Sequence, residues 1–488
     1  MFGFKRSSVQ LVVILAWLLR YYTFGSIVLW CIIACGLSLA VVLAVTTYDH
    51  DYWTSRGVFS PPAWPVVGHI LSVVMFKEQG GMCFKRIYDT YKDKRFLGCH
   101  QFYQRTLVVR DPELIRRVCV NDFQHFTDRG FFFNKDVDPL AGPNKLRGMF
   151  PLIENTAVEF VTRVQDLLTQ NKMGSNKNGS VKTDGQSNGV KQIFAVVNSE
   201  KLVGGYTADA IVPCAFGLKS NVMYNEDDPF AVALHAFYEM SLFNIFEKTM
   251  RQFWPAFVLF FRMRIIPKKT HDFFYNIVTT VLRARENGDQ EKRGDFIDMM
   301  MALRNDESNN NCKKDQEDVE ITDMVISANA FIIFLGGFET TSSTLAFLFL
   351  ELAANQQVQE KMREEIRQVV EKHEGKITYE LLQELVYMEM VIQAFIPERW
   401  SEGSTQPPPG VYMPFGDGPR YCIGKRFALI QMKCCLLRVL QHVRITPAPR
   451  PDAAGKLTVQ PRVEPFTADP RSPLTLHPAD SLVTLSLL

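Results

Sequence analysis

Ten consecutive residues near the C-terminal end, 415–424, constrain this chain more than any other segment. They read Phe-Gly-Asp-Gly-Pro-Arg-Tyr-Cys-Ile-Gly, and an apolar segment with helical periodicity follows to about Val443. The glycines permit tight turns and the close approach of a flat ligand. Cys422 stands where the following helix begins, and the free N–H groups and dipole at a helix N-terminus favour a thiolate. The segment therefore predicts a loop that presents a thiolate at the start of a helix.

The same loop carries features of a haem site. A thiolate is the form of cysteine that ligates iron. Arg420, two residues before Cys422, is a fixed cation suited to a carboxylate such as a haem propionate. Taken one at a time, these residues fit an ordinary glycine loop with a buried cysteine better than a ligand site. Their joint spacing is what favours the haem-thiolate interpretation.

This spacing resembles the haem signature of the cytochrome P-450 family, Phe-x-x-Gly-x-Arg-x-Cys-x-Gly, and matches it at every fixed position. The resemblance implies the mainly α fold of that family, with a minor β region. It also implies a haem b whose iron takes Cys422 as its axial ligand, with Phe415 packed beside the sulfur. Arg420, Gly418 and Gly424 would complete the haem-binding loop.

A second segment with chemical features lies inside an apolar helical stretch at about residues 321–354. Residues 336–341 read Gly-Gly-Phe-Glu-Thr-Thr. Each glycine inside a helix costs about 0.8–1 kcal/mol relative to alanine, and a buried carboxylate without a partner costs several kcal/mol more. A helix-packing contact with Glu339 turned to solvent is the alternative interpretation. Three unfavourable residues side by side make that alternative the weaker account.

These six residues resemble the family's oxygen-activation motif, [Ala/Gly]-Gly-x-[Asp/Glu]-Thr-[Thr/Ser]. The resemblance implies that Gly336 and Gly337 open a groove beside the haem, where dioxygen can sit. Glu339 and Thr340 would supply protons to that groove through water. Thr340 falls on the position of the family's catalytic threonine.

Weaker resemblances to the insect microsomal branch of the family extend from about residue 60 to Val443. The stretches that carry them, each of which could be ordinary helix or loop sequence, are residues 111–114, 126–130, 138–140, 207–217 and 293–298. They imply monooxygenation of an apolar organic substrate with dioxygen. Electrons would come from NADPH through a separate cytochrome reductase, since the chain shows no dinucleotide motif. By analogy the substrates are hormones, xenobiotics such as plant toxins, or insecticides.

The first 48 residues differ from the rest. Residues 11–19 are apolar, Arg20 interrupts, and residues 21–48 carry no charge. The second run would form a helix of roughly 42 Å, and a bilayer core is about 30 Å thick. A cleaved signal peptide is the alternative, and it is disfavoured because its apolar region is shorter. The sequence thus predicts an N-terminal membrane anchor in contact with lipid.

The resemblance places the anchored protein in the endoplasmic reticulum membrane, the microsomal fraction, with its catalytic domain on the cytosolic side. Lys5, Arg6 and Arg20 precede the span, and by the positive-inside rule they favour a cytosolic N-terminus. The two expectations conflict unless residues 11–19 help to form a hairpin.

The predicted domain organisation has three parts. Residues 1–48 form the anchor, residues 49–68 a linker with a Pro-rich hinge, and residues 69–488 the haem-binding catalytic domain. Prolines fix φ, so residues 60–68 are expected to form a stiff, extended connector, although an ordinary linker fits equally well. Residues 171–192 and 308–320 are polar and predict surface loops. Prolines and short β-branched runs from Thr446 predict a few strands.

The composition of the chain bears on its possible partners and on its redox environment. Hydrophobic residues make up 47% of the chain, which is enough for a substantial core, and the net charge is +2 with mixed signs. Nothing in this balance suggests a nucleic-acid partner. The 10 cysteines include no Cys-x-x-Cys pair. This usage fits a reducing compartment, where cysteines stay free or serve chemistry.

Two departures from the family pattern stand beside these matches. A helix of the family carries a Glu-x-x-Arg pair, and residues 387–394 read like the start of that helix. The sequence then continues at once with residues 395–400, which resemble a downstream Pro-Glu-Arg-Phe element. Glu360/Arg363 and Glu364/Arg367 fit the spacing one helix too early, and we expect them to be solvent-facing pairs. Arg399 would thus lack its usual partners.

The second departure lies near residues 142–145. The family places Trp-x-x-x-Arg there, on a helix that holds a haem propionate, and this interval contains neither residue. Both joins are abrupt while their flanks remain recognisable. An incomplete gene model or exon loss near 142–145 and 394–395 is one interpretation. A catalytically impaired, vestigial homologue that binds haem weakly or not at all is the other.

Overall fold

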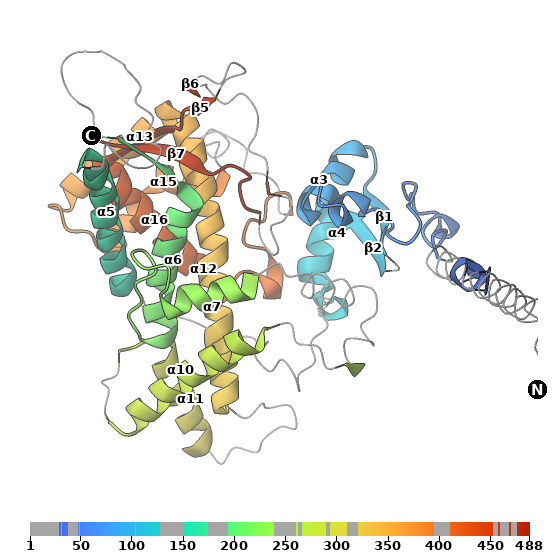
Figure 1. Cartoon of the computed structure of the whole chain (residues 1–488), viewed down its shortest axis with the longest axis horizontal. Coiled ribbons are helices and arrows are strands. Elements are labelled where there is room, and N and C mark those ends of the chain that lie inside the picture. Colours follow the sequence, from blue (N-terminus) through green and yellow to red (C-terminus); the bar gives the residue numbers. More distant parts are fainter. Residues whose placement is uncertain are drawn as a thin grey trace, which may run out of the picture. The chain divides into compact units, whose positions relative to one another are not determined.

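The computed structural model describes residues 29–30, 32–37, 47, 49–102, 104–126, 150–173, 194–238, 260–261, 266–288, 293–309, 321–394, 410–451, 457–458, 468–469 and 476–488. Its contacts divide the chain into two compact units, Met1–Asp111 and Pro112–Leu488. Figure 1 labels the helices and strands of both units.

Unit 1 is built on an antiparallel hairpin. Strands β1 (Phe96–Gln101) and β2 (Gln104–Val109) pair from Phe96 opposite Val109 to Gln101 opposite Gln104. From residue 49 onward, the helices described in this unit are η1 (Thr54–Arg56), α2 (Leu71–Val74) and α3 (Gly80–Thr90). No pattern in the sequence predicted the hairpin, whose pairing gives this unit its framework.

The Pro-rich segment docks on this hairpin. Trp64 and Gly68 exchange two backbone hydrogen bonds of 2.9 Å, and Gly68 forms a bridge with Gln101 of β1. The N–H of Gly98 donates to the carbonyl of Phe59 at 2.8 Å. The expectation of an extended connector is therefore wrong for residues 64–68. Fixed φ angles at proline suit a tight turn as well as an extended chain.

Unit 2 is mainly helical, as the sequence predicts. Its helical elements are α4 (Pro112–Arg116), the π-helical turn η2 (Arg117–Asn121), η3 (Phe123–His125), α5 (Phe150–Met173), α6 (Ser199–Phe216), α7 (Pro229–Tyr238), α10 (Lys268–Glu286), α11 (Phe296–Asn309), α12 (Asp323–Ala354), α13 (Gln356–Lys372), α14 (Tyr379–Glu384), α15 (Val386–Ala394), η5 (Gly418–Arg420) and α16 (Lys425–His442). The predicted helices at residues 321–354 and before Val443 are confirmed as α12 and α16.

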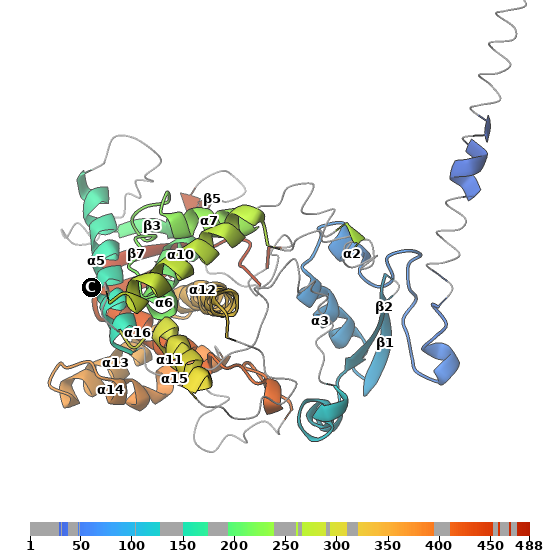
Figure 2. The same ribbon diagram turned by 90° about the horizontal axis from the view of Figure 1, so that it is seen from below.

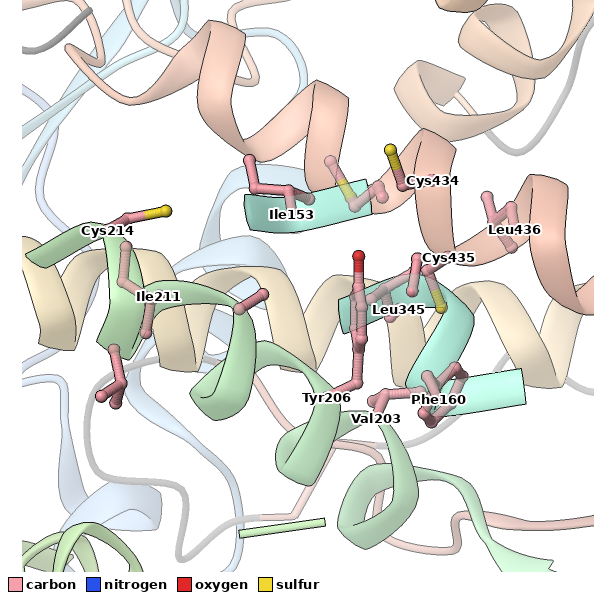
Figure 3. Close-up of a cluster of buried hydrophobic side chains, with 14 of the residues drawn as sticks. Ile153, Phe160, Val203, Tyr206, Ile211, Cys214, Leu345, Cys434, Cys435 and Leu436 are labelled. Atoms are coloured by element: carbon pink, nitrogen blue, oxygen red, sulfur yellow. The ribbon is translucent and has the colours of Figure 1, made fainter. Parts of the chain in front are cut away.

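Helices α6 and α12 are the centre of this unit, and Figure 2 looks nearly along α12. Thr322 begins α12, because its hydroxyl accepts a hydrogen bond from the N–H of Val325 at 3.3 Å. Both helices bury residues on most of their faces. Tyr206 of α6 is fully buried, projects toward α16 in Figure 3, and donates its hydroxyl to the carbonyl of Gln431 at 2.8 Å. This bond satisfies a polar group that would otherwise be costly to bury.

The minor β region follows the predicted pattern near the C-terminus. A three-stranded antiparallel sheet has the order β3 (Phe194–Asn198), β7 (Leu482–Leu487), β4 (Val443–Pro447). Leu485 of β7 lies opposite both Ala195 and Ile445. The short strands β5 (Arg450–Pro451) and β6 (Leu457–Thr458) pair separately. The prediction of strands in this region is confirmed.

Other expectations are corrected at their edges or lie outside the described residues. Helix α5 continues to Met173 and α11 to Asn309, so the two polar stretches begin as helix. The rest of both polar stretches is outside the described part.

The predicted membrane span is described only in part, and residues 38–46 lie outside the described part. Residues 29–30 and 32–37 of this span are helical and exposed. In the described part, α12 alone is long and apolar enough to cross a bilayer, and it is a largely buried core helix.

The two Glu-x-x-Arg pairs on α13, Glu360/Arg363 and Glu364/Arg367, differ in exposure. Glu364 and Arg367 face solvent, as expected. The Arg363 side chain is only 15% exposed and donates to the carbonyls of Leu440 at 3.0 Å and Val443 at 3.3 Å. The expectation was wrong for Arg363, because those carbonyls at the end of α16 give its guanidinium fixed partners.

The end of α6 provides a sharp test of packing. Gly217 caps this helix with φ +64°, and a Cβ there would lie 2.1 Å from both Arg285 Nη2 and Asp295 Oδ2. Those two side chains form an ion pair at 2.6 Å, with 2% and 0% exposed. Gly217→Ala is expected to lower the free energy of unfolding by about 4 kcal/mol, because it disrupts a buried pair in addition to adopting a disfavoured φ. Urea denaturation measures this change.

Gly288 is the matched control. It also has a positive φ, +81°, but no atom lies within 4 Å of a Cβ built there. Gly288→Ala should cost only about 1 kcal/mol, the backbone contribution. Equal effects of the two substitutions would show that the Arg285–Asp295 contact does not matter.

Candidate haem-binding site

The signature loop is closed by its own backbone. The N–H of Cys422 donates to the carbonyl of Phe415 at 2.6 Å, and the N–H of Tyr421 donates to the carbonyl of Gly418 at 3.0 Å. Helix α16 has Gly424 as its N-cap. Cys422 thus stands two residues before the N-cap, where unpaired backbone N–H groups gather. This is the placement that the sequence predicts.

The glycines of the loop have separate structural roles. Gly416 and Gly418 have φ angles of +72° and +68°. A Cβ on Gly418 would lie 2.1 Å from the carbonyl oxygen of Cys119 in η2. The close approach at Gly418 is therefore to the backbone of η2. At Gly424 a Cβ would lie 3.9 Å from the Cys422 sulfur, which is an ordinary contact.

Exposure distinguishes the Cys422 thiol from most described cysteines. Cys422 is exposed, whereas burial raises the pKa of Cys99 and of Cys434 to about 12. Its neighbours Tyr421 and Ile423 are 61% and 50% exposed. An accessible sulfur flanked by exposed apolar side chains at a helix N-terminus fits a flat, apolar, iron-bearing macrocycle. The residues present therefore fit a haem.

Two cations lie within three residues of Cys422 in the sequence, and each lies near an aromatic ring. The guanidinium of Arg420 is 5.9 Å from the Phe123 ring centre, and the ammonium of Lys425 is 5.7 Å from that of Phe415. Both cations are exposed. They give the rim of the loop a positive potential that suits an anionic group such as a propionate.

One face of α12 is open. Ile332, Gly336 and Thr340, four residues apart, are exposed on a helix that is otherwise mostly buried. The Thr340 hydroxyl donates to the carbonyl of Gly336 at 2.6 Å, and a Cβ on Gly336 would meet no atom within 4 Å. Residues four apart share a helix face, so a polar hydroxyl stands on an apolar, accessible strip.

Gly337 differs from Gly336. A Cβ on Gly337 would lie 2.7 Å from Ile211 Cδ1 of α6 and 3.4 Å from Phe427 Cε1 of α16. Gly337 is thus the point where three helices pack closely, and only Gly336 lies on the open side. Because Phe427 is in the first turn of α16, this contact brings the start of α16 beside residues 336–340. The two chemical segments therefore meet in unit 2.

Glu339 is buried and paired. Its side chain is 4% exposed, and Oε1 lies 3.5 Å from Nε2 of His477. The alternative in which Glu339 turns to solvent is wrong, because this histidine gives the carboxylate a partner inside the protein. His477, which lies far along the chain from Glu339, was not among the site residues predicted from the sequence. No local signal marks a lone histidine as a partner.

The described side of the first departure, before residue 395, retains a charged network. Glu389 of α15 pairs at 2.7 Å with Lys433 of α16, whose side chain is 2% exposed. The carboxylate of Glu365 accepts hydrogen bonds from the backbone N–H groups of Tyr387 and Met388, at 2.6 and 2.9 Å. Arg399 and residues 142–145 lie outside the described residues. Their expected partners therefore stay predictions.

Cys422 is exposed just before α16, and the first turn of α16 contacts α12, which exposes Thr340. In a mainly helical unit, this arrangement is that of the haem-thiolate class of proteins. The family model of Cytochrome P450 matches residues 59–394 and 393–460 of the sequence. The chain belongs to the cytochrome P450 family. By family it is a haem-thiolate monooxygenase, an oxidoreductase.

The similar proteins are insect enzymes, as the sequence predicts. The chain is 26% identical to Cytochrome P450 6B1 of Papilio polyxenes, over 84% of this chain and 93% of that protein. It is 28% identical to Probable cytochrome P450 6a23 of Drosophila melanogaster, over 81% and 89%. It is 27% identical to Cytochrome P450 6j1 of Blattella germanica, over 87% and 93%.

The alignments also show that this chain lacks residues that its relatives have. The family match is in two parts that meet at residues 393–394. The first relative is aligned over 496 positions, whereas the matched 84% of this chain is about 410 residues. About 86 positions of that relative thus have no residue of this chain opposite them.

Proposed function

We propose that this protein, in its complete form, oxidises an apolar organic substrate with dioxygen, using electrons from NADPH delivered by a separate cytochrome reductase. The observation that carries the proposal is the exposed Cys422 just before α16, a helix whose first turn contacts α12 at Gly337, next to the exposed Gly336. When bound, haem supplies the oxygen-activating chemistry. Hormones, xenobiotics and insecticides are the substrate classes that the insect relatives suggest.

Residues of this chain are proposed to bind the iron, to bind a propionate and to deliver protons. Cys422 would hold the haem iron through its thiolate, and its backbone N–H is fixed by the carbonyl of Phe415 at 2.6 Å. Arg420 is the proposed partner of a propionate. The exposed strip of Ile332 and Gly336 would face the substrate. Thr340, on the same strip, would present its hydroxyl to the substrate. Glu339, the buried neighbour of Thr340 in the sequence, is proposed to pass protons through water toward this strip.

Thr340→Ala tests the proton-delivery role. In a chain with both gaps filled, haem content should stay unchanged, because Thr340 is not a ligand. The rate of product formation should fall about a hundredfold, the low end of what positioned proton transfer contributes. NADPH should continue to be consumed, with hydrogen peroxide formed in place of product. The measurement is product and peroxide per NADPH.

Thr344→Ala is the matched control. Its hydroxyl donates to the carbonyl four residues earlier, at 2.8 Å, as Thr340 does, but one turn farther along α12. Product per NADPH should be close to that of the parent. Unchanged coupling in Thr340→Ala would remove Thr340 from the mechanism.

We further propose that residues 1–48 anchor the protein in the endoplasmic reticulum membrane, that residues 49–68 link the anchor to the body, and that residues 69–488 form the catalytic domain on the cytosolic side. The uncharged run of residues 21–48 and the exposed apolar side chains of Leu29 and Trp30 support the anchor. Expression with and without residues 1–48 tests it. The shortened protein should leave the membrane fraction.

A second candidate function is favoured by the two departures. The family match breaks at residues 393–394, where the Glu-x-x-Arg pair is expected. The chain as written would then be a homologue with impaired haem binding, or the product of an incomplete gene model. The transcript sequence across residues 142–145 and 394–395 distinguishes these two origins.

A further inference from the structure

A C-terminal segment docks directly on α12. The hydroxyl of Ser343 donates to the carbonyl of Leu476, and the N–H of Asp469 donates to the carbonyl of His477 at 2.7 Å. These contacts place the imidazole of His477 between α12 and α6. The family match ends at residue 460, so His477 is not a residue that the matched region assigns.

The imidazole of His477 joins two carboxylates. Nε2 lies 3.5 Å from Glu339 Oε1, and Nδ1 lies 2.9 Å from Glu200 Oε1 of α6. The Nδ1 contact is an ion pair rather than an aligned hydrogen bond. Exposure rises along the row, from 4% for Glu339 to 17% for His477 and 37% for Glu200. The row therefore runs from the buried Glu339, which precedes Thr340 in the sequence, toward the surface.

Charge explains why this arrangement is stable. Burial lowers the pKa of His477, but Glu200 and Glu339 outweigh burial and raise it to about 9. Within the described part of the chain, these two carboxylates are the ionisable groups that act on His477 from α6 and α12. His477 is thus an imidazolium at neutral pH. A buried carboxylate on α12 gains the opposite charge that it needs.

We propose that His477 is the positioning residue for Glu339, holding its carboxylate in one buried position through the ion pair. The proposal rests on the proton-delivery role proposed for Glu339. It adds the residue that fixes the orientation of that glutamate. The ion pair stabilises the protein only while the His477 ring is charged. The stabilisation that His477 and Glu339 give to the fold must therefore depend on pH.

The first test uses the full chain and needs no haem. Since the pKa of His477 in the folded protein lies above its ordinary value of 6.5, its contribution to stability is complete below pH 6.5 and disappears as the pH rises through about 9. The urea midpoints of the parent and of His477→Gln should differ at pH 6 and converge above pH 9. In Glu339→Gln, the effect of His477→Gln at pH 6 should be less than half of that in the parent.

His373→Gln is the matched control. Nε2 of His373 lies 3.0 Å from Glu384, at another place in unit 2. The effect of His373→Gln should be the same with Glu339 or Gln at position 339. If the effect of His477→Gln is equally insensitive to Glu339, the proposal is overturned. Should His477→Gln fail to fold, Glu339→Gln alone must still flatten the pH dependence of the parent.

The second test measures coupling in a chain with both gaps filled. His477→Gln should lower product per NADPH severalfold at neutral pH, with haem content and KM unchanged, and His477→Lys should restore part of it by restoring the cation. Parent-like coupling in His477→Gln, with loss in Glu339→Gln, would overturn the positioning role and leave the proposed function intact. Parent-like coupling in Glu339→Gln would instead refute the role of the glutamate itself.

Discussion

Cys422→Ala is expected to abolish the thiolate-type carbon monoxide spectrum of the reduced, haem-loaded protein. The thiol is exposed at the start of α16, and its backbone is fixed by the carbonyl of Phe415. Alanine offers no ligand, and the buried cysteines cannot replace it because burial keeps their thiols protonated. The loss should be complete, and product formation should disappear with it. Absorbance spectra of the reduced protein with and without carbon monoxide measure this.

Cys119→Ala is the matched control for this variant. Cys119 is partly buried in η2, and its carbonyl packs against Gly418 of the same loop. Its thiol is outside the signature, so the spectrum should persist. Survival of the thiolate spectrum in Cys422→Ala would refute the ligand assignment, and loss in Cys119→Ala alone would move that assignment to η2.

The 488-residue chain as written is expected to incorporate little haem and to show negligible monooxygenase activity. By resemblance, the Glu-x-x-Arg pair and the arginine that matches Arg399 form a buried charged network behind the haem loop. Removing one partner of such a pair costs about 3–5 kcal/mol, and a domain is stable by only about 5–15 kcal/mol. Because Arg399 can turn to water, we expect a cost at the lower end of the range of about 3–5 kcal/mol. The loop that presents Cys422 should still be poorly held.

Filling both gaps with the matching segments of a close relative should restore haem binding and turnover. The measurement is haem per protein chain after purification, together with product formed with NADPH and reductase. Chains with a single gap filled separate the two contributions. The segment after residue 394 should matter more, because it carries both partners of Arg399, whereas the segment near residue 142 supplies one propionate contact. A full complement of thiolate-ligated haem in the unrepaired chain would contradict the prediction.

The sequence by itself determined the features whose physics is local. Helix α12 follows from apolar periodicity and the Thr322 cap, and α16 follows from the apolar stretch after Gly424. The position of Cys422 at a helix start is also local, since it needs only the turn made by Gly416 and Gly418. Short-range hydrogen bonds and backbone preferences fix such elements before any distant contact forms.

Only the tertiary structure decided which distant groups meet. It paired Glu339 with His477, assigned Gly337 to packing and Gly336 to the open face, and fixed Arg363 on the carbonyls that end α16. It also folded the Pro-rich segment back onto a hairpin that periodicity did not reveal. Each of these contacts joins residues far apart in the sequence. A single side chain cannot specify its partner locally, because the partner is chosen by how the helices and strands pack.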